Sequence, residues 1–187
     1  MIDEGEGPAV VLLHGSGTTS DVWRDLGSLL AARFRVIAPD GDPVDSFEEL
    51  GKDRLAMIGE REGAVTALRL GQRAEALVLI APTASPADLP AVDAPVLIFA
   101  GEDDPVAPGV AEALNEAIPT STLGLLPGVG HDVIGEAALT VFPMVYEYLR
   151  ARYLAEPHGH EAEGVVRIQL ERRPPWIDDP DGDEEDA

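Results

Sequence analysis

The sequence predicts an α/β protein with a doubly wound, mainly parallel sheet of six strands. Six short apolar runs alternate with helical patterns at a spacing of about 25 residues, which is typical of a parallel sheet with helices on both faces. The runs are continuously apolar, as in strands that are buried on both faces. Nineteen glycines and sixteen prolines provide many short connections. We therefore expect a wound core without internal repeats.

The first half of the pattern begins with the apolar run Pro8–His14, which has the length and composition of a buried strand. Ser20 is placed to cap a helix whose apolar residues recur at helical spacing. Arg35–Ala38 is a second short strand, and Ser46–Leu50 is at most a brief helix. Leu55–Ile58 is the third strand and leads into another helix.

The second half continues the alternation. Three further strands are predicted at Ala76–Ala81, Val96–Ala100 and Ser121–Leu126. A helix over roughly Gly109–Ala117 separates the last two strands. A final helix is expected to hold Pro143 in its first turn, where a missing backbone N–H costs no helical hydrogen bond.

Two segments are predicted, a domain over residues 1–157 and a C-terminal extension over residues 158–187. Within the extension, Val165–Leu170 has the composition of one added strand. The end, Ile177–Ala187, holds seven acidic residues and is expected to be disordered. The extension is either a solubilising end or a strand that pairs with a second subunit in a homodimer.

Charge and composition exclude several classes of partner. Thirteen basic against 35 acidic residues give a formal charge of −22, which repels nucleic acid and anionic membranes. The chain has no cysteine, so disulfides and thiolate metal sites are excluded. No uncharged run has the length of a signal peptide or a membrane span, so we expect a cytoplasmic protein. The acidic, lysine-poor composition fits either a GC-rich genome or a high-salt cytoplasm.

One short stretch joins the third strand to its helix through a tight turn. Gly59 and Gly63 flank Arg61, and glycines at both shoulders let a strand and a helix approach closely around the residue between them. Taken alone, this spacing also fits an ordinary strand-to-helix turn. Because a guanidinium stays protonated and has no acceptor lone pair, Arg61 cannot act as a nucleophile.

Four motifs in chain order resemble those of the α/β-hydrolase fold. Gly59–Gly63 resembles its nucleophile elbow, G-x-S-x-G, with arginine in place of serine, and His14–Gly17 resembles its H-G-x-G oxyanion loop. Gly101–Pro108 resembles the acid loop, and Gly128–His131 resembles the histidine loop. The order of elbow, acid and histidine is that of the family. The resemblance covers residues 8 to about 155 and implies a hydrolase-like core.

The resemblance also implies roles for individual residues. Asp104 and His131 correspond to the acid and the base of a catalytic pair. The backbone N–H groups of Ser16 and Glu62 correspond to the oxyanion hole. Arg61 stands at the nucleophile position, where its cation is suited to bind an anionic group. No cofactor and no metal is implied.

Alternatives stay open at three of these positions. Asp103 can replace Asp104 as the partner of the imidazole, and Asp104 can instead be a turn residue before Pro105. His131 can be an ordinary loop histidine. His14 is expected to be structural, packing the oxyanion turn, rather than catalytic.

Two departures from the family pattern are expected to make this a minimal, capless core. The family commonly places a cap domain after the strand that corresponds to Ala76–Ala81, but only the proline-rich link Pro82–Pro95 follows here. The site should therefore be shallow and open to water. The family's first two strands have no predicted counterpart, because the run Pro8–His14 resembles the third.

Three functions are compatible with such a scaffold lacking its serine. In the first, the His131–Asp104 pair is a general base in non-covalent hydrolase- or lyase-type chemistry on a small molecule, with Arg61 binding an anionic group. In the second, the chain is an inactive pseudo-hydrolase that serves as a binding or regulatory module, with Arg61 paired to Glu60 or Glu62. In the third, the serine of the oxyanion loop is a displaced nucleophile. Intact matches at the acid, base and oxyanion loops favour the first.

Overall fold

The computed structural model describes residues 1–40, 55–71, 74–83, 86, 92–153 and 164–167, the last four by their backbone path only. The six predicted strands are present as β2 (Ala9–Leu13), β3 (Arg35–Ala38), β4 (Leu55–Glu60), β5 (Ala76–Ile80), β6 (Val96–Gly101) and β7 (Ser121–Leu126). Every neighbouring pair among them is parallel. Almost all of their residues are buried, because both faces of the sheet are covered.

Two further strands extend the sheet at its edges, so the described residues form a sheet of eight strands where the sequence predicts six. β1 (Ile2–Glu4) pairs antiparallel with β3, and β8 (Gly164–Arg167) pairs parallel with β7. The strand order is β1-β3-β2-β4-β5-β6-β7-β8. The sequence gives no signal for β1, because this edge strand is partly exposed and two of its three residues are acidic.

These edge strands change two expectations about the ends of the chain. The antiparallel β1 shows that a strand does precede the run Pro8–His14, contrary to the prediction that none does. β8 covers the first part of the strand predicted at Val165–Leu170. Because β8 pairs with β7, residues 164–167 belong to the same sheet as the strands that precede them, and the predicted division at residue 157 stays a prediction.

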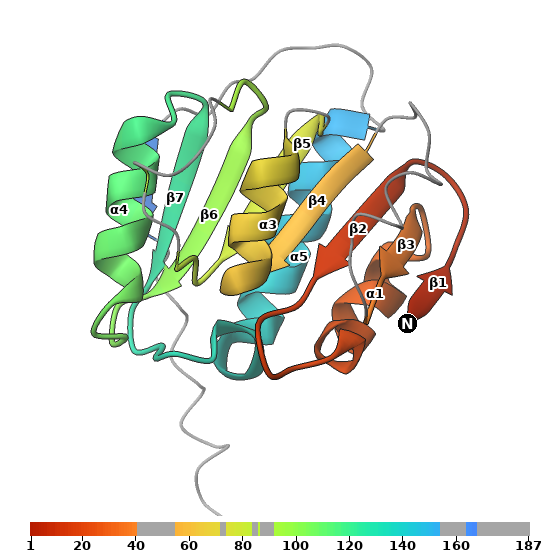
Figure 1. Cartoon of the computed structure of the whole chain (residues 1–187), viewed down its shortest axis with the longest axis horizontal. Coiled ribbons are helices and arrows are strands. Elements are labelled where there is room, and N and C mark those ends of the chain that lie inside the picture. Colours follow the sequence, from red (N-terminus) through yellow and green to blue (C-terminus); the bar gives the residue numbers. More distant parts are fainter. Residues whose placement is uncertain (41–54, 72–73, 84–85, 87–91, 154–163, 168–187) are drawn as a thin grey trace, which may run out of the picture.

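Helices cover both faces of the sheet, as the predicted doubly wound arrangement requires (Figure 1). One face carries α1 (Arg24–Leu30) and α5 (Val133–Tyr153), and the other carries α3 (Glu62–Leu70) and α4 (Ala107–Ala117). Phe34, next to β3, packs edge-on against Tyr146 and Tyr153 of α5. The predicted fold class, an α/β protein with a mainly parallel sheet, is confirmed.

Two helix starts differ from the prediction. A 3₁₀ turn over Ser20–Trp23 precedes α1, and Thr19 rather than Ser20 is its cap, accepting a backbone N–H with its side-chain oxygen. Pro143 lies inside α5 and not in its first turn. The helical path begins ten residues earlier, at Val133, and departs from helical dihedral angles at Ala137. Sequence periodicity alone does not reveal a helix that continues through a proline.

Several predictions fall wholly or partly outside the described residues. These are the brief helix Ser46–Leu50, the last residues of the strand Val165–Leu170 and the acidic end Ile177–Ala187. The link Pro82–Pro95 is described only in part, so the lack of a cap stays a prediction. Among the described helices, none is long and apolar enough to span a membrane.

The parallel strands bring five separate loops to one edge of the sheet. The segments that follow β2, β4, β5, β6 and β7 all leave from the carboxyl ends of their strands. Residues 14–17, 61, 81–83, 104 and 131 lie in these segments. This edge is therefore where the sequence-predicted site residues meet.

Candidate functional site

The turn between β4 and α3 consists of Arg61 alone, with φ 50° and ψ −113°. A positive φ is unfavourable for a residue that carries a side chain, so the surrounding structure must hold it. A Cβ atom on Gly63 would collide with the backbone oxygens of Leu13 and His14, and one on Gly59 would collide with the backbone of Gly63. The two glycines therefore allow the close approach that presents Arg61 at the carboxyl edge of the sheet.

The Arg61 guanidinium lies between a carboxylate and an imidazole. Its Nε donates to Oε1 of Glu60 at 2.9 Å, and its Nη1 lies 3.4 Å from Nε2 of His131. Because a guanidinium can only donate, Nε2 of His131 is the acceptor in this contact. The Glu60 side chain is only 4% exposed, and its Oε2 has no hydrogen-bond partner among the described residues. Of the two acids that the sequence offers as partners of Arg61, the structure pairs it with Glu60.

His131 and Asp104 form a close pair, with Nδ1 of the imidazole 2.6 Å from Oδ2 of the carboxylate. The Asp104 side chain is 3% exposed, and its Oδ1 accepts the N–H groups of Val106 at 2.7 Å and Ala107 at 2.8 Å. The Ala107 N–H contributes most to holding the pKa of Asp104 below its usual 3.8, and burial opposes this shift. Because Nε2 of His131 accepts from Arg61, Nδ1 carries the proton and donates to Asp104.

The structure also shows the contacts of the alternative residues Asp103 and His14. Asp103 is exposed, and it is Asp104 that contacts the imidazole. Nδ1 of His14 lies 2.9 Å from the Gly15 carbonyl oxygen, a local contact within the turn. In the described part of the chain, no three or more His, Cys, Asp or Glu side chains are grouped as metal ligands.

One of the two N–H groups that the resemblance assigns to an oxyanion, that of Ser16, contacts the side chain of Glu62. The Ser16 N–H donates to Oε2 of Glu62 at 2.9 Å. This bond is the largest cause of the lowered pKa of Glu62, followed by the bond from the backbone N–H of Glu62 itself. From the sequence, Glu62 is expected only as a backbone donor or as a partner of Arg61. An acid directly after the elbow, in the first helical turn, was the available signal for this contact.

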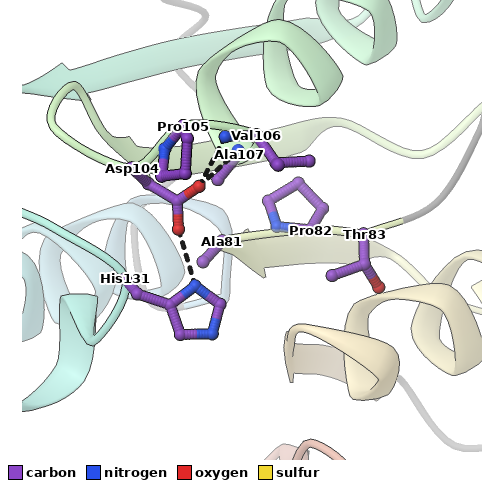
Figure 2. Close-up of a pocket in the computed structure, with 8 residues that line it drawn as sticks. All are labelled: Ala81, Pro82, Thr83, Asp104, Pro105, Val106, Ala107 and His131. Carbon is purple, nitrogen blue, oxygen red and sulfur yellow. Dashed lines mark hydrogen bonds and ion pairs between the residues drawn. The ribbon is translucent and has the colours of Figure 1, made fainter.

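An open pocket of about 440 Å³ lies beside the histidine (Figure 2). Its lining is mainly apolar and consists of Ala81, Pro82, Thr83, Asp104, Pro105, Val106, Ala107 and His131. In Figure 2 the pair of His131 and Asp104 lies on one side of the pocket, and Thr83 lies on the other. Residues 81–83 carry no catalytic motif in the sequence. Their position directly after β5, at the carboxyl edge of the sheet, is the signal that points to them.

Comparison with sequences of known proteins gives short matches. No family model matches the chain. Haloalkane dehalogenase 2 of Mycobacterium bovis is 49% identical over 39 residues, which are 21% of this chain and 14% of the dehalogenase. The chain thus spans a small part of the length of the curated relatives it matches, between 11% and 14%.

Comparison with solved structures covers most of the chain. An esterase from Thermogutta terrifontis, solved with malate bound, has a TM-score of 0.70 and 19% identity, covering 81% of this chain and 93% of the esterase. A mutant meta-cleavage product hydrolase from Pseudomonas fluorescens, complexed with acetates, has a TM-score of 0.70 and 19% identity, covering 80% of this chain and 93% of the hydrolase. The chain has the α/β-hydrolase fold.

Proposed function

We propose that the chain binds a small organic anion without forming a covalent intermediate. The observation that carries this proposal is the 3.4 Å contact between Nη1 of Arg61 and Nε2 of His131. In a serine hydrolase this imidazole nitrogen takes the proton of the nucleophile. Here its lone pair faces a permanent cation, which supplies no proton for transfer at physiological pH and can attract a negative charge.

The surroundings of Arg61 support an anionic ligand. The guanidinium lies at the N-terminus of α3, where backbone N–H groups and the helix dipole also favour negative charge. The side chain is 23% exposed, so a ligand can reach it. Two structural neighbours were solved with malate and with acetates, which are carboxylates. A carboxylate is therefore the ligand group we assign to Arg61.

A second function is favoured by the geometry of His131 and Asp104. Their 2.6 Å hydrogen bond and the buried carboxylate would suit a general base in non-covalent hydrolase- or lyase-type chemistry. This reaction requires Arg61 to leave Nε2, for example by turning toward the anionic group of the substrate. Hydrolysis by the wild type of mono-4-nitrophenyl succinate, an activated ester that carries a carboxylate, would favour this reaction over binding alone if the His131→Ala variant loses the activity.

We expect hexanoate to stabilise the wild-type protein and not the Arg61→Ala variant. Binding to the folded state alone should raise the melting temperature by about 3–5 °C at a hexanoate concentration ten times the dissociation constant. Differential scanning fluorimetry with hexanoate and with neutral hexanamide measures this shift. Arg69→Ala removes the same charge from an exposed position of α3 and should keep the shift. An equal shift in Arg61→Ala, or with hexanamide, would contradict the proposal.

A further inference from the structure

The carboxylate of Glu62, at the start of α3, accepts a backbone N–H from a distant part of the chain. The donor is the N–H of Ser16 in the loop after β2, 2.9 Å from Oε2 of Glu62. Arg61 acts on the same carboxylate through its charge. A backbone N–H group beside a cation is an arrangement that recognises a carboxylate or an oxyanion. Here a side chain of the protein itself fills that arrangement.

We propose that Glu62 is an internal occupant of a carboxylate site, and that an apolar monocarboxylate binds there by displacing it. This inference rests on the proposed function, because it assumes that the ligand carries its negative charge to Arg61. The inference adds the class of ligand, an apolar monocarboxylate. It also explains why the Glu62 side chain fills the site while no ligand is bound. The affinity for the ligand is then set by competition with Glu62.

The space between the loop and the elbow is shaped around this carboxylate. A Cβ atom on Gly15 would lie 3.2 Å from Oε2 of Glu62 and 3.3 Å from Cβ of Arg61. Any side chain at position 15 would therefore crowd the volume that the carboxylate fills. The absence of a side chain there keeps the cradle open to a carboxylate, whether it comes from Glu62 or from a ligand.

Glu62 is suited to leave this position. Glu62 is an exposed residue, so its carboxylate can rotate out of the site and into the solvent. Water would then replace the hydrogen bond from Ser16 that the side chain gives up. The carboxylate of a ligand would in turn accept the Ser16 N–H, so this donor stays paired with a carboxylate.

The pocket beside His131 defines the remainder of the ligand. His131 lines this pocket and also contacts Arg61, so the pocket and the cation share one side chain as their boundary. Apart from Asp104, His131 and Thr83, the lining is made of alanine, proline and valine. A carboxylate with a short apolar chain matches both parts, and burial of each CH₂ group adds to its affinity.

The test is the affinity for hexanoate, measured by isothermal titration calorimetry on the full chain. The Glu62→Ala variant should bind hexanoate at least about tenfold more tightly than the wild type. If the Glu62 carboxylate fills the site in about nine of ten wild-type molecules, the apparent affinity of the wild type for hexanoate is about tenfold weaker than that of the open site. Glu62→Gln should tighten binding less, since its amide oxygen can still accept. Glu102→Ala removes one exposed acid at the same edge of the sheet and should change the affinity less than twofold.

Each outcome of this experiment decides a different part of the account. Wild-type binding that Glu62→Ala and Glu62→Gln leave unchanged would overturn displacement and keep the proposed function. If Glu102→Ala raised the affinity for hexanoate as much as Glu62→Ala does, the change in net charge would explain the increase, and the role of Glu62 would be overturned. No binding of hexanoate by wild type or by either Glu62 variant, each shown to be folded by circular dichroism, would overturn both proposals.

Discussion

The double variant Arg61→Ser/Glu62→Ala is expected to hydrolyse 4-nitrophenyl acetate at least about 10²-fold faster than wild type. Serine at the elbow would place a nucleophile beside Nε2 of His131, an imidazole whose Nδ1 already lies 2.6 Å from Oδ2 of Asp104. Removal of the Glu62 carboxylate frees the Ser16 N–H for the oxyanion of the reaction. Steady-state release of 4-nitrophenol measures the gain.

Matched variants separate the two substitutions. Arg61→Ser alone should be the weaker enzyme by about 10²-fold, because one blocked oxyanion donor costs that much in hydrolases. Arg61→Ala/Glu62→Ala should show no gain, and a fluorophosphonate probe should label only proteins with serine at position 61. Labelling of the wild type would point to Ser16 as nucleophile. A double variant no faster than its alanine counterpart would show that acid, base and donors are not assembled.

Gly63→Ala is expected to lower the free energy of unfolding by about 3 kcal/mol or more. The added methyl group would meet the backbone oxygens of Leu13 and His14, and backbone cannot move aside as a flexible side chain can. The helix would have to shift away from β2, which would open the elbow. Urea denaturation followed by circular dichroism measures the loss.

Gly109→Ala is the control for this substitution. A Cβ atom at Gly109 meets nothing within 4 Å, and the residue lies in α4, where alanine is the better helix former. This variant should be more stable than wild type by about 0.5–1 kcal/mol. A Gly63→Ala variant as stable as Gly109→Ala would contradict the close packing of α3 against the end of β2.

The central strands and the meeting of the site loops could be predicted because they depend on simple local patterns. Continuous apolar runs such as Val96–Ala100 can only be buried strands or buried helices, and their short length favours strands. Parallel strands carry the segments after them to the same edge, which places Asp104 and His131 together. The edge strand Ile2–Glu4 lacks such a pattern, because its pairing depends on a neighbour distant in sequence.

The pairing of charges within the site could not be predicted from the sequence. Arg61 has an acid on each side, and nothing in their spacing distinguishes them. The structure separates them by position: Glu60 ends β4 and is buried beside the guanidinium, whereas Glu62 starts α3 and reaches the loop after β2. This choice depends on the fold of three segments at once. It decides which donors are free for a ligand.

The most direct test of the central claim is a nuclear magnetic resonance titration of ¹⁵N-labelled protein with hexanoate. If Arg61 and the Ser16 N–H bind the ligand carboxylate, the Arg61 Nε–H and Ser16 amide resonances will shift together and give one dissociation constant. Neither should shift with hexanamide. An anion site at the elbow would be contradicted if both resonances stayed unchanged while hexanoate saturated another part of the protein. It would also be contradicted if both stayed unchanged at the highest soluble concentration of hexanoate.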